Sequence, residues 1–135
     1  MFKWANWFGR DNTEKEILSP DKRTRCLFIL KNGEMFYRIE RDGKILVDLS
    51  KLGFLISGEK SFGDNLKLIR SQTKHCDEIV ELLWGEDQFL RNHYYETIFY
   101  LSETKDPKRI ITLRFRVFND AVAFRYEIPP QPKFQ

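Results

Sequence analysis

The sequence predicts an all-β fold, a mostly antiparallel β-sandwich. Its clearest pattern lies near the C-terminal end, where apolar and polar residues alternate over residues 111–117 and again over residues 122–128. Alternation on both sides of the pair Asn119-Asp120 is typical of an antiparallel hairpin with one buried face. The 12 Phe and 5 Tyr residues of the chain also favour strands over helices.

The two faces of this hairpin have different compositions. We expect four apolar residues to be buried on one face: Phe115, Val117, Val122 and Phe124. Arg and Glu residues occupy the other face, and we expect them to pair across the strands.

The first half of the chain predicts a three-stranded meander. A strand over residues 23–30 leads to Asn-Gly at residues 32–33, and both central residues of a type I′ turn need a positive φ. A second strand over residues 35–39 leads to Asp-Gly at residues 42–43 and then to a third strand. The inner face of this third strand is expected to carry Ile45, Val47 and Leu49.

The second half predicts further strands separated by polar loops. We expect strands over residues 51–57, 66–71 and 79–84, and a loop over residues 88–92. Residues 93–101 are apolar on both faces, which predicts a central strand that is covered on both sides.

Composition and charge indicate a single globular domain. The chain has 135 residues, enough for one domain with a real core, and 41% of them are hydrophobic, which excludes a disordered chain. The net charge is +3 with both signs interspersed, as on a solvated surface rather than a face that binds nucleic acid. No apolar run approaches the ~20 residues that a membrane span needs.

Residues 1–17 are predicted to be an N-terminal leader that packs loosely or is disordered, and residues 18–135 to form the domain. Four aromatic residues among the first eight leave a second interpretation open, a short amphipathic helix on a membrane interface. The segment lacks the apolar stretch and the small-residue cleavage site of a secretory signal peptide.

Two cysteines are candidates for a disulfide, and one cluster of polar residues is a candidate metal site. Cys26 and Cys76 are interpreted as free thiols, and a disulfide between them stays open only for an exported chain. His75-Cys76-Asp77 is interpreted as a surface loop, since three adjacent residues cannot close a tetrahedral metal shell without distant partners. We therefore assign no metal ligand and no cofactor to this chain.

Five short motifs occur in a fixed order. They are LSPD at residues 18–21, LGF at 52–54, WGE at 84–86, RNHYYE at 91–96 and FRVFNDAVAFRYEIP at 115–129. With these motifs the chain resembles the N-terminal β-domain of glycoside hydrolase family 97, a family of α-glucosidases and α-galactosidases. The resemblance implies a partial super-sandwich of the galactose-mutarotase-like type. It also implies that the family's domain would continue past Gln135 and lead into a catalytic barrel.

This resemblance implies a non-catalytic role. The chain would pack on the downstream catalytic barrel and help to shape a site for an α-glycoside, the carbohydrate partner. The family's catalytic carboxylates lie on the barrel, its calcium belongs to the full-length enzyme, and its members are usually periplasmic or exported. Glu86 and Asp87 point apart on an extended chain, so these acids and Glu96 are interpreted as solvated or paired surface groups.

One stretch offers a candidate site that faces a carbohydrate or the barrel. Trp84 supplies an apolar plane for a sugar ring, and the polar residues after it supply hydrogen bonds to hydroxyls. A second interpretation, in which Trp84 belongs to the core and the loop only docks on the barrel, stays open. The candidate residues are Trp84, Glu86, Arg91, Asn92, His93 and Glu96.

A rival hypothesis is a free-standing β-module that binds single-stranded nucleic acid or a protein partner. Aromatic residues among Lys and Arg can form a stacking platform for single strands. Such binding falls steeply with added salt, whereas saccharide binding does not.

The family pattern usually has Gly where this chain has Ala121. Glycine adopts a positive φ freely and alanine does not. We therefore predict that the positive φ of the last hairpin turn falls on Asn119 or Asp120, which tolerate it better.

Overall fold

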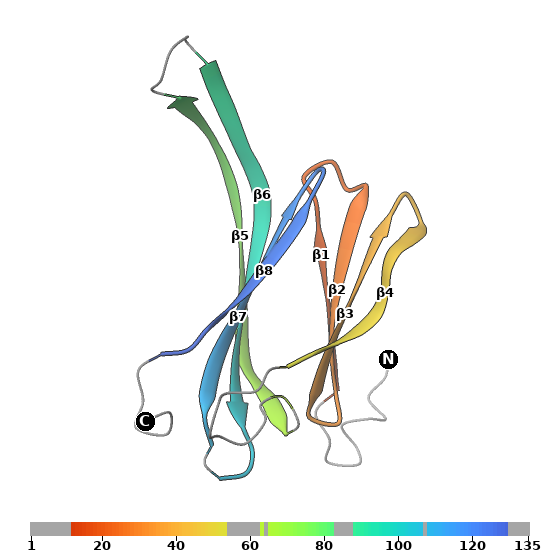
Figure 1. The fold of residues 1–135 in the computed structure, drawn as a ribbon, viewed down its shortest axis with the longest axis vertical. Coiled ribbons are helices and arrows are strands. Elements are labelled where there is room, and N and C mark those ends of the chain that lie inside the picture. Colours follow the sequence, from red (N-terminus) through yellow and green to blue (C-terminus); the bar gives the residue numbers. More distant parts are fainter. Residues whose placement is uncertain (1–11, 54–62, 64, 83–87, 107, 130–135) are drawn as a thin grey trace.

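Two antiparallel four-stranded sheets make up the protein (Figure 1). The structure is a computed structural model and describes residues 12–53, 63, 65–82, 88–106 and 108–129. The first sheet contains β1 (Thr13–Leu18), β2 (Thr24–Lys31), β3 (Glu34–Arg41) and β4 (Lys44–Leu52). The second contains β5 (Leu66–Leu82), β6 (Gln88–Glu103), β7 (Ile110–Phe118) and β8 (Val122–Glu127). The predicted all-β sandwich is confirmed, and the described residues include no helix that could span a membrane.

The meander of the first half is confirmed, with its two tight turns. Asn32 and Gly33 have φ values of 53° and 82°, and Asp42 and Gly43 have 52° and 79°. Both central residues of each turn thus adopt the positive φ that matches the twist of the flanking strands. Strands β2, β3 and β4 follow one another in the sheet.

The predicted inner face of the third strand is wrong. Ile45 and Leu49 are exposed, and only Val47 is half-buried. The Asp42-Gly43 turn places Ile45 opposite Glu40, and register shifts on either side of Ile39 then bring Val47 opposite Ile39. β4 is also an edge strand of its sheet.

Strand β1 lies within the segment that the sequence placed in the leader. The sequence of β1 is mostly charged and shows no alternation of apolar and polar residues. Only Ile17, at 2% exposure, enters the core. β1 is an edge strand, and charged side chains on an edge strand keep other chains from pairing with its open edge. An edge strand can therefore be mostly charged. Asn12 precedes β1, and its Oδ1 accepts a 3.1 Å hydrogen bond from Asn32 N. Residues 1–11 lie outside the described residues, as does most of residues 51–57 beyond the end of β4.

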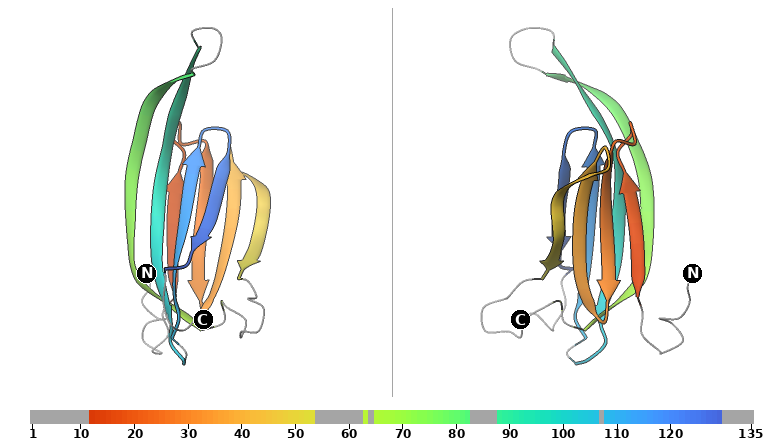
Figure 2. Two further views of the ribbon diagram at one scale, coloured as in Figure 1. Left: turned by 60° about the vertical axis from the view of Figure 1, so that its left-hand side comes forward. Right: turned by 90° about the vertical axis from the view of Figure 1, so that its right-hand side faces the viewer.

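The second sheet differs from prediction at its longest hairpin. Residues 66–71 and 79–84 were expected to be two strands, but β5 runs unbroken through residues 66–82. Residues 88–92, expected to be a loop, begin β6. Pairing of β6 with β7 begins only at Tyr94, so residues 76–82 and 88–93 form a two-stranded arm beyond the sandwich (Figures 1 and 2). Water reaches both faces of the arm, which is why its sequence lacks a strand pattern.

β6 is a central strand, as predicted, with β5 on one side and β7 on the other. The β7–β8 hairpin is also confirmed, but its second strand is less buried than expected. Phe115 is fully buried while its cross-strand partner Phe124 is 40% exposed, and Val122 is half-buried. The reason is that β8 is an edge strand.

The predicted backbone conformation of the hairpin turn is wrong. The non-glycine residues with positive φ in the described part of the chain are Lys22, Asn32, Asp42 and Lys108. The last turn instead closes with a 2.8 Å hydrogen bond from Phe118 N to Ala121 O. The Asn119 side chain accepts a 2.8 Å hydrogen bond from Asp21 N, so contacts with the first sheet hold this turn.

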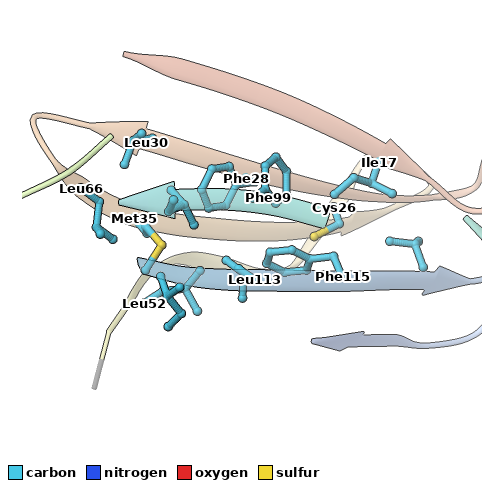
Figure 3. Close-up of a cluster of buried hydrophobic side chains, with 13 residues drawn as sticks. Ile17, Cys26, Phe28, Leu30, Met35, Leu52, Leu66, Phe99, Leu113 and Phe115 are labelled. Carbon is cyan, nitrogen blue, oxygen red and sulfur yellow. The ribbon is translucent and has the colours of Figure 1, made fainter. Parts of the chain in front are cut away.

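The core lies between the two sheets (Figure 3). At its centre the rings of Phe28 and Phe99 stack with centroids 4.1 Å apart, and Phe115 meets Phe99 edge-on at 6.1 Å. Offset-stacked and edge-on geometries are the favoured ones for aromatic pairs. Cys26 is buried beside them as a free thiol, and burial raises its pKa to about 12. Cys76 is a free thiol in the arm.

Candidate functional site

The four described residues of the predicted carbohydrate- or barrel-facing set do not lie on one face. Trp84 and Glu86 lie outside the described residues. The other four lie on β6, where successive side chains point to opposite faces. Arg91 and His93 therefore share the face that continues the core side, and Asn92 and Glu96 share the other, where Asn92 Nδ2 lies 3.4 Å from Glu78 Oε1.

The face that carries Arg91 and His93 has a cross-strand polar cluster. Arg91 donates two hydrogen bonds to Asp77, from Nε to Oδ1 at 2.9 Å and from Nη2 to Oδ2 at 2.8 Å. The Nε2 atoms of His75 and His93 are 2.7 Å apart. The hydrogen bond from Arg91 is the main reason why the pKa of Asp77 is lowered.

The segment His75-Cys76-Asp77 was interpreted as a surface loop, which is wrong. It lies within β5, so the His75 and Asp77 side chains share one face and Cys76 faces the opposite way, beside Tyr94. The polar sequence suits a strand here because the arm has no sheet packed against it.

Glu96 is the most confined acid of the candidate set. The sequence placed it among surface acids, but its side chain is completely buried. Three cations surround it: Arg116 Nε at 2.8 Å, Arg114 Nη1 at 2.9 Å and Lys74 Nζ at 3.2 Å. Burial alone would raise its pKa, but the hydrogen bonds from Arg116, Arg114 and Lys74 outweigh burial and lower the pKa to about 2.

A shallow hollow of about 180 Å³ lies beside this cluster on the outer face of the second sheet. Its lining residues are Arg114, Arg116, Ala123, Phe124 and Arg125. The cations are already engaged, because Arg114 Nη2 also binds Glu127 Oε1 at 3.1 Å and Arg125 Nε donates to Glu127 Oε2 at 2.8 Å. The predicted pairing of Arg and Glu across these strands is confirmed.

This cluster is suited to holding strands together rather than to hydrolysis. A catalytic acid needs a raised pKa, whereas hydrogen bonds from Arg114 and its neighbours lower the pKa of both Glu96 and Glu127. One guanidinium binds both carboxylates, which leaves neither free to face a glycosidic bond. Among the described residues, no group of three or more His, Cys, Asp and Glu side chains is placed to hold a metal ion.

The buried Glu96 predicts a specific pH dependence. Its pKa falls from an ordinary value of 4.5 to about 2 on folding, so its stabilising effect is complete above about pH 5 and is lost as the pH falls toward 2. Other acids with lowered pKa values add to this trend, so the comparison needs a matched variant. In urea unfolding at pH 7 and pH 3, Glu96→Gln should lose less stability on acidification than the unaltered chain. Equal losses would contradict this assignment.

The sequence of the chain matches the family model described as "Glycosyl-hydrolase 97 N-terminal" over residues 17–135. The chain belongs to this family. The resemblance seen in the five motifs is thus confirmed, and the match covers β2 to β8 and the last two residues of β1.

Known relatives of this family 97 domain are much longer than the chain. A retaining α-galactosidase of Bacteroides thetaiotaomicron is 24% identical over 110 residues, which cover 82% of this chain and 16% of that protein. A glycoside hydrolase family 97 enzyme from Pseudoalteromonas sp. strain K8, solved with panose, superposes with a TM-score of 0.80 at 24% identity. The superposition covers 87% of this chain and 18% of the chain of that enzyme. A β-arabinopyranosidase structure superposes with a TM-score of 0.76 at 23% identity. This superposition covers 89% of this chain and 19% of the chain of that enzyme.

The chain therefore spans less than a fifth of the length of these relatives. The structural likeness establishes the same two-sheet fold.

Proposed function

We propose that this family 97 domain is a non-catalytic part of an α-glycoside hydrolase that packs on a catalytic barrel and helps to shape its carbohydrate site. The observation that carries the proposal is the family match over residues 17–135, together with relatives that are themselves glycoside hydrolases. Calcium, a periplasmic or exported location and the α-glycoside partner belong to this proposal, as what membership of the family implies.

The surface of the arm supports docking on another protein layer. Ile79, Phe89 and Leu90 are 69%, 65% and 51% exposed. Ile79 and Phe89 share one face of the arm and Leu90 lies on the other, so the arm exposes apolar side chains on both faces. Exposed apolar side chains on a protruding element are typical of an interaction surface. A two-stranded hairpin alone is marginally stable in water, so a covering layer would also stabilise the arm.

The rival hypothesis of a module for single-stranded nucleic acid is not supported. Such a platform needs aromatic rings exposed beside unpaired cations. Here Arg91 is bound to Asp77, and Arg114 and Arg116 are bound to Glu96. Among the described aromatic residues, Phe28, Phe99 and Phe115 are in the core.

The isolated 135-residue chain should not hydrolyse aryl α-glucosides or aryl α-galactosides, with or without calcium. Among the described residues, arginines hold Glu96 and Glu127 ionised, and general acid catalysis needs a protonated carboxyl. We also expect self-association through the exposed arm, measured by light scattering, that decreases when a family 97 barrel is fused downstream. A stable monomer whose turnover is lost on Glu96→Gln would overturn the proposal, and a chain that stays monomeric without the barrel would overturn the docking role of the arm.

A further inference from the structure

The only two histidines of the chain meet at the base of the arm, where it leaves the sandwich. His75 on β5 lies opposite Tyr95, and His93 on β6 lies opposite Asp77, so the two rings are diagonal neighbours on one face of the hairpin. Their Nε2 atoms approach to 2.7 Å. Two imidazole nitrogens that point at each other from neighbouring strands are a potential pair of metal ligands.

The geometry of the two rings is fixed by their surroundings. The Tyr95 ring stacks on His75 with centroids 4.6 Å apart and an interplanar angle of 23°. The His93 ring lies 4.9 Å from the His75 ring. His75 is exposed and the His93 side chain is 21% exposed, so an ion can reach the pair from solvent.

We propose that His75 and His93 bind one divalent transition-metal ion, such as Zn²⁺ or Ni²⁺, through their Nε2 atoms. Metal–nitrogen bonds of about 2.0–2.1 Å place two nitrogens about 2.9 Å apart at a right angle and about 3.3 Å apart in a tetrahedron. Without metal the 2.7 Å contact is a hydrogen bond, in which one Nε2 carries the proton. On binding the ion, that ring loses its Nε2 proton and takes up the tautomer with the proton on Nδ1, and both rings turn so that the two Nε2 lone pairs face the ion. Water fills the other coordination positions.

Asp77 sets the charge of this site. Its Oδ2 atom lies 3.9 Å from His93 Nε2, so an ionised carboxylate stands beside the ion. Two hydrogen bonds from Arg91 hold that carboxylate away from the coordination shell. Removal of the guanidinium frees Asp77 to become a third ligand.

A bound ion would link β5 to β6 at the base of the arm, where pairing with β7 ends. Pairing with β7 begins only at Tyr94, so cross-strand pairs hold the arm together. A ligand that binds only the paired hairpin stabilises it by mass action. This inference concerns the arm itself and does not depend on the proposed carbohydrate role.

The test is calorimetric titration of the 135-residue chain with ZnCl₂ and with NiCl₂ in a non-chelating buffer. One ion should bind per chain, and added metal should slow amide hydrogen exchange of residues 76–82 and 88–93. His75→Asn and His93→Asn should each weaken binding at least about tenfold, since loss of outer-shell partners alone costs about 10–100-fold. Circular dichroism without metal checks that the variants are folded.

Two further variants separate the possible ligands. Cys76→Ser removes the nearby thiol, which faces the other side of β5, and should leave affinity unchanged. Arg91→Gln should tighten binding by releasing Asp77. The proposal is overturned if the histidine variants bind as well as the parent, if Cys76→Ser abolishes binding, or if added metal increases the size of the particles in light scattering above that of the metal-free chain. Unchanged affinity in Arg91→Gln would overturn the role given to Asp77.

Discussion

Phe115→Ala is expected to lower the free energy of unfolding by about 3–5 kcal/mol, as truncation of a fully buried aromatic residue does. Phe115 has no exposed surface and contacts the stacked pair Phe28 and Phe99 from the opposite sheet and its own. Its removal leaves a cavity at the centre of the sandwich that neighbouring strands cannot fill without moving. Urea unfolding followed by circular dichroism measures the loss.

Phe124→Ala is the matched control. Phe124 lies directly opposite Phe115 in the hairpin, with ring centroids 5.4 Å apart, but it is 40% exposed on an edge strand. Because the apolar area removed from water is smaller, the cost should be roughly half or less. Equal losses in the two variants would show that the core does not centre on Phe115.

Arg109→Met is expected to cost about 3–5 kcal/mol, because it leaves the carboxylate of Glu103 buried without its cation. Arg109 and Glu103 are 1% and 3% exposed. Arg109 binds the carboxylate from Nε to Oε1 at 2.7 Å and from Nη2 to Oε2 at 2.8 Å. The pair closes the connection from β6 to β7, where Glu103 N also donates to Arg109 O at 2.9 Å.

Two controls show whether burial causes this loss. Arg23→Met breaks a similar two-bond pair with Asp42, but the side chains are 57% and 49% exposed, so the cost should be at most about 1 kcal/mol. The double variant Glu103→Leu with Arg109→Met should recover most of the stability, because it removes the buried charge together with its partner. A double variant as unstable as Arg109→Met alone would contradict the electrostatic explanation.

The sequence located much of the first sheet and the last hairpin correctly. Asn-Gly and Asp-Gly indicate tight turns, because few other residue pairs accept two positive φ values. Alternation of apolar and polar residues indicates a strand with one buried face. Both signals depend only on residues that are neighbours in the chain, so they can be recognised in a single sequence. Among the motifs that carried the family resemblance, LSPD lies at the connection from β1 to β2, RNHYYE lies on β6 and the last motif lies on β7 and β8, whereas WGE lies outside the described residues.

The candidate site was predicted less well. Four of its six residues lie on β6. His93 and Glu96 were predicted to lie on a strand, but Arg91 and Asn92 were placed in a loop, so the division of the four side chains between two faces was not predicted. Glu96 was placed at the surface, since nothing local to it shows that Arg114 and Arg116 arrive from β7. The meeting of His75 and His93 likewise depends on the register of two strands.

The sequence by itself therefore determined the fold class, the turns and the alternation of the central strands. Tertiary structure decided which apolar residues are buried at sheet edges, as the exposure of Ile45 and Phe124 shows. It also decided that the polar residues of the arm form a strand and that Glu96 has a pKa of about 2. The physical reason is that burial, register and charge pairing depend on residues far apart in the chain, whereas turns and alternation depend on neighbours.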